Sequence, residues 1–169
     1  LFAMPYSLTR RTLEETNNMI TKHSPLEGIH IGTAATVAIR ELPGLHTIDL
    51  RVAPGSAVFA AVVETLGIAL PGKPGHTISG SVSGNGEAHA LCLAPDWWLL
   101  IGYPDAVAQL APLLMQEHHL SEVDVSAQRT TIELEGPAAR EVLAHLWEQD
   151  LREKTFPVGA VSQGLMAKS

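Results

Sequence analysis

The amino-acid sequence predicts an α+β fold, with helices packed on a mixed or antiparallel sheet and split βαβ units of the ferredoxin-like type. Strand-like segments, in which apolar and polar residues alternate, are interleaved with segments whose apolar residues recur at helical spacing. In addition, the order strand, proline, small residues, helix occurs three times, in IDLRVAPGSAVFAAVVETLG, in residues 98–114 and in IELEGPAAREVLAHLWEQDL. Strand–helix units interleaved with hairpins are typical of this fold class.

Residues 1–27 differ from the rest and are predicted to be an N-terminal extension or arm, which leaves 28–169 as a single domain. The spacing of Thr12 and Glu15 is that of a capping box and predicts a short helix to about Lys22. Its apolar residues are too few to form a packed helix face, so we expect an appendage and not a core element.

The first regular elements are predicted between residues 36 and 67. Alternating apolar residues in 37–39 and 48–52 predict two half-buried strands, with a turn at Pro43-Gly44 between them. The run AVFAAVVETLG predicts a helix capped by Gly67. Its apolar face is formed by Val58, Ala61, Val62 and Leu66.

A hairpin and a further strand–helix unit are predicted next. TISGSV and EAHALCLA flank Asn85-Gly86, and Asn-Gly between alternating segments is a strong hairpin signal. Residues 96–102 predict an apolar strand, after which Pro104 opens a helix that His118-His119 closes. The apolar positions of this helix are Val107, Leu110, Leu113 and Leu114.

The last predicted unit consists of a strand over 131–135 and the helix AAREVLAHLW. Gly136-Pro137 is expected at the junction between them, because proline is tolerated in the first turn of a helix. The residues expected to face the sheet are Val142, Leu143 and Leu146.

Composition narrows the class of protein. The chain is 46% hydrophobic, but no apolar run approaches the roughly 18 to 20 residues that span a bilayer, and the first 30 residues carry no secretory signal. A net charge of −7, with 11 Lys and Arg, disfavours a nucleic-acid partner. The single Cys92 cannot form an internal disulfide, which is typical of a reducing compartment. We therefore expect a cytoplasmic protein without a membrane segment.

Charged residues make up only 17% of the chain, against roughly 25% in an average soluble protein. Two explanations stay open. One is simply an alanine-rich composition. The other, which we favour, is that partners permanently cover part of the surface, since obligate interfaces are depleted in charge.

The glycine-rich stretches do not match nucleotide-binding loops. Gly80, Gly84 and Gly86 lack the GxGxxG spacing, and the segment after them reads as a strand, so a hairpin is the better interpretation. Gly72-Lys73-Pro74-Gly75 lacks the GK[ST] ending of a phosphate loop, and Pro74 removes an N–H that phosphate would need. We interpret this stretch as a turn.

Eight histidines are many for 169 residues, but none of them forms an HxH, HxxxH or HxxEH unit. A metal site assembled in space from three of them stays open. Their positions are His23, His30, His46, His76, His89, His118, His119 and His145. Cys92 lies in the apolar run LCLA without an adjacent base or cation, which indicates a buried thiol and not a nucleophile.

The remaining candidates also favour structural roles. Ser79, Ser121 and Ser126 lack a GxSxG context. Asp124 and Asp150 are separated by a strand and a helix, and Asp150 is expected to tie down a loop.

Tryptophans are the best candidates for contact with other proteins. Trp97-Trp98 alternate faces on a strand, so one ring is expected in the core. The other ring is an expected interface anchor, as is Trp147 if it is exposed. Flavin contact by these rings is not indicated. We assign no catalytic, cofactor-binding or metal-binding residue to this chain.

A set of short motifs follows in a fixed order in the last third of the chain. They are an Asp-x-Ser lead, an Arg-Thr strand, Gly-Pro-x-Ala-Arg, Asp-Leu, Phe-Pro-x-Gly and a Gln. Here these residues are Asp124, Ser126, Arg129, Thr130, Gly136, Pro137, Ala139, Arg140, Asp150, Leu151, Phe156, Pro157, Gly159 and Gln163. With SPL at 24–26, LGIALP at 66–71 and LAPDWWLL at 93–100, this pattern resembles the gamma subunit of heterotetrameric sarcosine oxidase, over most of residues 24–165.

The resemblance implies a T-protein-like folate-binding domain fold, here truncated at the C-terminus because the chain stops at Ser169. It also implies a non-catalytic structural subunit of a complex that oxidatively demethylates sarcosine to glycine. The partners would be the alpha, beta and delta subunits. FAD, FMN, NAD and tetrahydrofolate would sit on alpha and beta and zinc on delta, with no cofactor on this chain.

Two other functions stay open. One is a stand-alone folate-binding or aminomethyltransferase-like domain. The other is a folate domain for tRNA modification, which the net charge of −7 disfavours. In folate-dependent relatives a functional acidic motif follows the next strand, beyond the residues of this sequence.

Overall fold

The computed structural model describes residues 23–82, 86–116 and 119–167. The capping-box helix predicted at Thr12, the hairpin turn at Asn85 and the position of His118 lie outside these residues. The elements in chain order are β1 (His30–Thr33), β2 (Val37–Glu41), β3 (Thr47–Val52), α2 (Ala57–Leu66), β4 (Thr77–Val82), β5 (Gly86–Ala94), β6 (Trp97–Ile101), α3 (Ala106–Leu114), β7 (Leu120–Asp124), the 3-10 turn η1 (Ser126–Gln128), β8 (Ile132–Glu135) and α4 (Ala139–Leu146).

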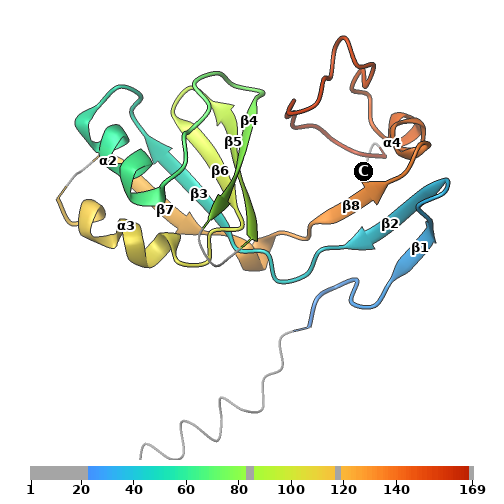
Figure 1. The fold of residues 1–169 in the computed structure, drawn as a ribbon, viewed down its shortest axis with the longest axis horizontal. Helices are drawn as coiled ribbons and strands as arrows, with labels where there is room; N and C mark the ends of the chain where they lie inside the picture. Colours follow the sequence, from blue (N-terminus) through green and yellow to red (C-terminus); the bar gives the residue numbers. More distant parts are fainter. Residues whose placement is uncertain (1–22, 83–85, 117–118, 168–169) are drawn as a thin grey trace, which may run out of the picture.

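The larger of two sheets has five strands in the order β4-β5-β6-β3-β7, and every neighbouring pair is antiparallel. As a consequence β6 and β7 run parallel with β3 between them, and β3 and β5 run parallel with β6 between them. Helix α3 connects the first of these parallel pairs, and α2 followed by β4 connects the second (Figure 1). These are split βαβ units. The predicted α+β fold of ferredoxin-like type is confirmed, with β4 added at the edge.

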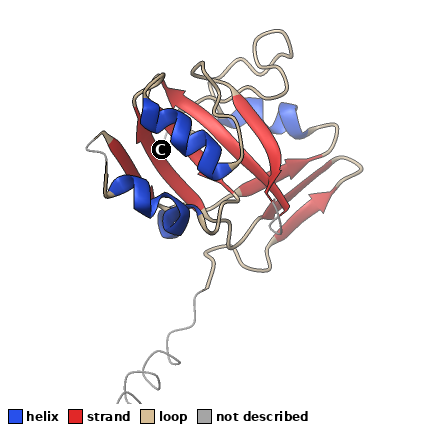
Figure 2. Ribbon diagram, turned by 60° about the vertical axis from the view of Figure 1, so that its left-hand side comes forward, coloured by secondary structure: helices blue, strands red, loops and turns tan. Residues whose placement is uncertain are grey.

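Both helices of these units lie on one face of the five-stranded sheet (Figure 2). The hydrophobic core fills the space between, because alternate residues of each strand point toward the helices. Its most buried large side chains are Trp98, Ile48, Leu50, Leu100, Leu110, Val52, Val62 and Cys92. Trp98 is therefore the core ring of the Trp97-Trp98 pair. Its indole Nε1 donates to the carbonyl of Pro71 at 2.9 Å.

Local capping explains where α2 begins and ends. The Ser56 hydroxyl accepts a hydrogen bond from the backbone N–H of Phe59 at 3.1 Å, as an N-cap does. At the other end Gly67 adopts the left-handed conformation, with φ of 65°, and its N–H donates to the Val63 carbonyl. The predicted cap at Gly67 is confirmed.

The smaller sheet has three antiparallel strands in the order β1-β2-β8. Its register aligns Ile31, Ile39 and Leu134 in one row across all three strands. The turn at Pro43-Gly44 forms as predicted, but the strands on either side of it do not pair with each other. Instead β2 pairs with β8, and β3 pairs with β6 and β7. This pairing was not predictable from neighbours in the sequence.

Gly136 lies at the junction between β8 and α4, as predicted. Its φ is 117°, and a Cβ there would lie 2.5 Å from the Thr36 carbonyl oxygen. A side chain at this position would therefore collide with the β1–β2 turn.

The structure corrects the expected face of α4. Val142 and Leu143 are half-buried, but Leu146 is 45% exposed. The reason is that the helix ends at this residue and Trp147 is already extended, with φ of −125°.

Two strands were not predicted, and one helix is shorter than expected. Strands β1 and β7 are both missing from the sequence-based assignment, because their residues do not form a long alternating pattern. Helix α3 ends at Leu114, and His119 lies just before β7 instead of closing the helix. None of the described helices is long and apolar enough to cross a membrane.

The chain after α4 turns back toward the five-stranded sheet (Figure 1). His76 and Ala160 form an antiparallel bridge beside β4. Thr77 N–H donates to the Gly159 carbonyl, and Val161 N–H donates to the Gly75 carbonyl, both at 2.8 Å. The C-terminal segment thus covers the start of the β4 edge.

Candidate functional site

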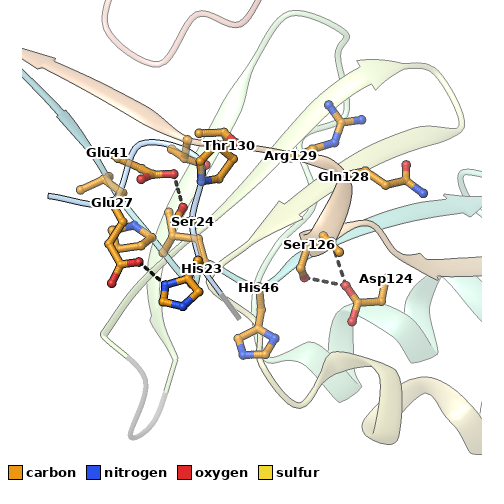
Figure 3. Close-up of a pocket in the computed structure, with 17 residues that line it drawn as sticks. His23, Ser24, Glu27, Glu41, His46, Asp124, Ser126, Gln128, Arg129 and Thr130 are labelled. Atoms are coloured by element: carbon orange, nitrogen blue, oxygen red, sulfur yellow. Dashed lines mark hydrogen bonds and ion pairs between the residues drawn. The ribbon is translucent and has the colours of Figure 1, made fainter. Parts of the chain in front are cut away.

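A crevice lies where the chain passes between the two sheets (Figure 3). Its volume is about 1000 Å³. Three segments line it: the residues that precede β1, the β2–β3 connection, and the end of β7 with the β7–β8 connection. We call this site the junction crevice. It is lined by His23, Ser24, Pro25, Glu27, Glu41, Leu42, Pro43, Gly44, Leu45, His46, Asp124, Ser126, Ala127, Gln128, Arg129, Thr130 and Thr131.

On one side of the junction crevice, Ser126 is fully engaged in a turn. Its hydroxyl donates to Asp124 Oδ1 at 2.5 Å, and its backbone N–H donates to the same oxygen at 2.9 Å. The Ser126 hydroxyl oxygen in turn accepts from the N–H of Thr47 at 2.9 Å. This arrangement ties β7 to the start of β3. It gives Asp124 and Ser126 a structural role, as the sequence indicated.

The other side is held by contacts of the segment before β1. The Ser24 hydroxyl donates to Glu41 Oε1, and His23 Nδ1 lies 3.0 Å from Glu27 Oε2 (Figure 3). The second oxygen of Glu41, Oε2, is buried without a hydrogen-bond partner among the described residues. Sequence reasoning did not single out Glu41, because its partner is 17 residues away in the chain.

The junction crevice offers hydrogen-bond acceptors and mixed charge. Figure 3 shows Arg129 and Gln128 extending away from the Ser24–Glu41 pair. In the described ranges no group of three His, Cys, Asp or Glu side chains is placed to hold a metal ion. Likewise, no described histidine nitrogen is bonded to Ser126 or Ser24, the two serines that line the crevice.

One histidine does contact a serine, on the hairpin of the larger sheet. Ser79 Oγ and His89 Nδ1 lie 2.8 Å apart across β4 and β5. Both residues are on the face of the sheet away from the helices, since their register neighbours Ile78 and Ala90 point into the core. Cys92 is 1% exposed, and burial raises the pKa of its thiol. The prediction of a buried cysteine is confirmed.

Asp150 and Arg140, two residues of the motif series, brace the loop that follows α4. Asp150 accepts hydrogen bonds from the side chain and backbone of Arg152 and from the hydroxyl of Thr155. The Arg152 guanidinium holds the pKa of the Asp150 carboxyl well below its ordinary value. Arg140 donates to the carbonyls of Leu151 and Phe156. The predicted loop-tying role of Asp150 is confirmed.

A second cluster lies on the helix-free face of the larger sheet. Trp97 Nε1 donates to Asp49 Oδ2 at 2.9 Å, and the Arg51 guanidinium lies 4.3 Å from the centre of the Trp97 ring. A cation over an indole face is attractive and fixes the orientation of the ring. Trp97 is half-buried, and so is Trp147, which packs edge-on against Phe156 at 6.0 Å. The contact between Arg51 and Trp97 crosses strands, so sequence reasoning missed it.

Burial raises the pKa of two further groups. Burial raises the pKa of Tyr103 to about 12, and its hydroxyl has no hydrogen-bond partner among the described residues. Burial, with a smaller effect of the Asp124 charge, raises the pKa of Glu122. Glu122 is opposite Leu50 in the register, so its side chain is directed toward the core face at the edge of the sheet.

Comparison with known proteins gives a consistent result. A family model described as sarcosine oxidase, gamma subunit family matches residues 51–169. Sarcosine oxidase subunit gamma of Corynebacterium sp. (strain P-1) is 38% identical over 128 residues, which is 75% of this chain and 61% of the relative. The same subunit of Corynebacterium sp. (strain U-96) is 34% identical over 135 residues, 79% of this chain and 63% of the relative.

A solved structure is also similar. It is a heterotetrameric sarcosine oxidase from Corynebacterium sp. U-96 in complex with pyrrole 2-carboxylate, one chain of which superposes with a TM-score of 0.64 at 34% identity. The match covers 76% of this chain and 65% of that chain. This chain therefore spans about three fifths of the length of the curated relatives that it matches.

Proposed function

The chain belongs to the sarcosine oxidase gamma subunit family, and we propose on this basis that it is a structural subunit of a heterotetrameric sarcosine oxidase. The observation that carries the proposal is how the motif residues are used. Arg140 and Asp150 direct their hydrogen bonds to the loop after α4, and Gly136 makes room for the β1–β2 turn. Residues of this kind maintain a shape and do not form a reaction centre.

The full proposal includes partners and cofactors. The chain assembles with alpha, beta and delta subunits that oxidatively demethylate sarcosine to glycine, and the one-carbon unit goes to tetrahydrofolate or leaves as formaldehyde. FAD, FMN, NAD, tetrahydrofolate and zinc are bound by those subunits, and this chain contributes no catalytic, cofactor-binding or metal-binding residue. Residues 1–27 form an arm and 28–169 one domain. A cytoplasmic location is supported by the single cysteine, Cys92.

The surface of the smaller sheet supports an assembly role. On β2, Ile39 lies opposite Ile31 of β1, and Glu41 lies opposite Ile132 of β8. Because Ile39 and Glu41 are two positions apart, Ile31 and Ile132 point to the same face of the smaller sheet. Ile31 is 59% exposed and Ile132 is 47% exposed. An apolar face of this kind, in a chain with 17% charged residues, is what a subunit presents to a permanent partner.

The decisive experiment compares the chain alone with the chain co-expressed with the alpha and beta subunits. Alone, it should show no flavin absorbance and no measurable folate affinity. Co-expressed, it should co-purify at fixed stoichiometry and bury more than about 2000 Å² in total. Stoichiometric flavin or micromolar folate binding by the isolated chain would support a stand-alone folate-binding or aminomethyltransferase-like domain instead. A monomer that stays unassociated beside those subunits would also overturn the proposal.

A further inference from the structure

We propose that the outer edge of β4, at Ser79 and Ser81, accepts an extended strand from a partner subunit by main-chain hydrogen bonding. This inference rests on the proposed function and names one of its contact surfaces. Strand addition to a free sheet edge is an established mode of protein recognition, in which backbone groups supply the affinity.

The backbone hydrogen bonds at the start of β4 show which of its residues direct their N–H and C=O groups toward β5 and which direct them outward. The His76 carbonyl accepts from Cys92 N–H in the β5 strand, whereas Thr77 N–H donates outward to Gly159. In an extended strand successive residues direct their backbone groups to opposite sides. Ser79 and Ser81 therefore present their N–H and C=O groups on the same outer side as Thr77.

The C-terminal segment begins to cover this edge but leaves it after one bridge. Pairing is made at His76 and Ala160, and continued pairing would place Val158 opposite Ile78. A turn intervenes, in which Ala160 N–H donates to the Pro157 carbonyl at 3.0 Å, and Val158 is 93% exposed. The positions beside Ser79 and Ser81 are thus not filled by residues 157–161.

The chemistry of this edge differs from that of β7 and β8, two other edge strands in the described part of the chain, whereas the fourth, β1 (HIGT), also lacks acidic residues, Lys, Arg and Pro. Strand β4 contains no charged residue and no proline. By contrast β7 carries Glu122 and Asp124, and β8 carries Glu133 and Glu135. Charges and prolines on edge strands are the usual protection against pairing with another chain. An exposed edge that lacks them is suited to pairing.

The occupant is a strand of a different subunit and not a second copy of this chain. If the β4 strands of two copies paired about a twofold axis, residues 159–161 of each copy would occupy the space into which the β4 strand of the other copy has to extend. Pairing would then be limited to Ser79 and Ser81. A strand from a different subunit meets this obstruction at only one of its ends. Because β4 is uncharged, we expect the incoming strand to be uncharged as well.

The test uses the full chain, co-expressed with the alpha and beta subunits, and four variants. Ser79→Pro removes the outward N–H, and Ser79→Ala is its matched control, since both lose the hydroxyl that contacts His89. Ser81→Lys places a charge on the edge, and Ser81→Gln is its uncharged control. The Pro and Lys variants should lose about tenfold or more of the co-purified subunits, and the controls should retain them.

The outcomes separate the two proposals. If the wild type and all variants co-purify equally, the edge inference is overturned while the subunit assignment stands. If the wild type itself fails to co-purify, the subunit assignment fails and the edge inference with it. Circular dichroism verifies that Ser79→Pro is folded, and if it is not, Ser81→Lys decides.

Amide hydrogen exchange gives a second measurement. The N–H groups of Ser79 and Ser81 should exchange rapidly in the isolated chain and about tenfold or more slowly in the complex. Unchanged exchange in a complex that forms would overturn the inference. Protection that appears in the isolated chain as its concentration rises would overturn it in favour of a second copy.

Discussion

The guanidinium of Arg140 donates a hydrogen bond from Nη1 to the backbone carbonyl of Phe156 at 3.0 Å. The same nitrogen donates to the carbonyl of Leu151, so one side chain on α4 secures two points of the loop that follows. Two of the short motifs recognised in the sequence, Gly-Pro-x-Ala-Arg and Phe-Pro-x-Gly, are therefore linked directly in space.

Removing this link should destabilise the protein measurably. We expect Arg140→Ala to lower the free energy of unfolding by about 1–2 kcal/mol, because hydrogen bonds from a charged donor to two carbonyls are lost. Arg129→Ala, in which an exposed arginine is truncated, is the matched control and should change it by less than about 0.5 kcal/mol. Urea denaturation measures both. Equal effects would show that Arg140 does not brace the loop.

Truncation of leucines should reveal the gradient of burial. Leu110 is fully buried, so Leu110→Ala should cost about 2–5 kcal/mol. Leu143 is half-buried, so Leu143→Ala should lower the free energy of unfolding by about 1–2 kcal/mol. Leu146 is 45% exposed, so Leu146→Ala should lower it by less than about 1 kcal/mol. Thermal or chemical denaturation gives the order. A larger loss at Leu146 than at Leu143 would contradict the described position of α4.

Asp150 should stabilise the protein at neutral pH and lose this effect in acid. Its folded pKa lies below the ordinary value of 3.8, so the contribution is present above that pH and is lost as the pH falls through the folded pKa. The difference in melting temperature between the wild type and Asp150→Asn should be constant near neutrality and shrink in strong acid. A difference independent of pH would indicate that the carboxyl charge is not involved.

Glu122 should behave in the opposite way. Its folded pKa is raised above 4.5, so its ionisation opposes folding, and stability is lost as the pH rises from 4.5 through the folded pKa. Glu122→Gln should therefore raise the melting temperature at neutral pH by about 2–4 °C, which corresponds to about 1 kcal/mol in a chain of this length. Below pH 4.5 the variant should show no such gain. A destabilised variant at neutral pH would refute this account.

Local signals in the sequence predicted the strand–helix units, and non-local pairing is what they missed. The helix at 57–66 was predictable because its apolar face and Gly67 cap lie within one segment. The division into two sheets was not, since it depends on pairs such as Arg40 and Glu133, which are 93 residues apart. Strand β1 escaped prediction because all four of its residues are exposed.

In the candidate site, too, local features were predictable from the sequence and contacts between distant segments were not. Burial of Cys92 and of one ring of the Trp97-Trp98 pair follows from short apolar runs, and the tie made by Asp150 follows from its place after a helix. The junction crevice joins three segments that are distant in the chain, so Glu41 and Ser24 could not be paired from sequence alone. For the same reason the Arg51–Trp97 contact needed the strand register.

The order of strands has a consequence for how the protein acquires its structure during synthesis. All five strands of the larger sheet lie in the sequence between β2 and β8, the strands that pair to form the smaller one. As the chain leaves the ribosome, β2 can pair with β1 at once but cannot pair with β8 until β3 to β7 have emerged and collapsed, because closing a long loop is unfavourable until its contents are compact. The Leu42 N–H donates to Thr131 beside β8, so by alternation Arg40 also faces β8, and we expect the amide of Leu50 to become protected before that of Arg40 in pulse-labelled refolding. The sheet that emerges first would then be completed last.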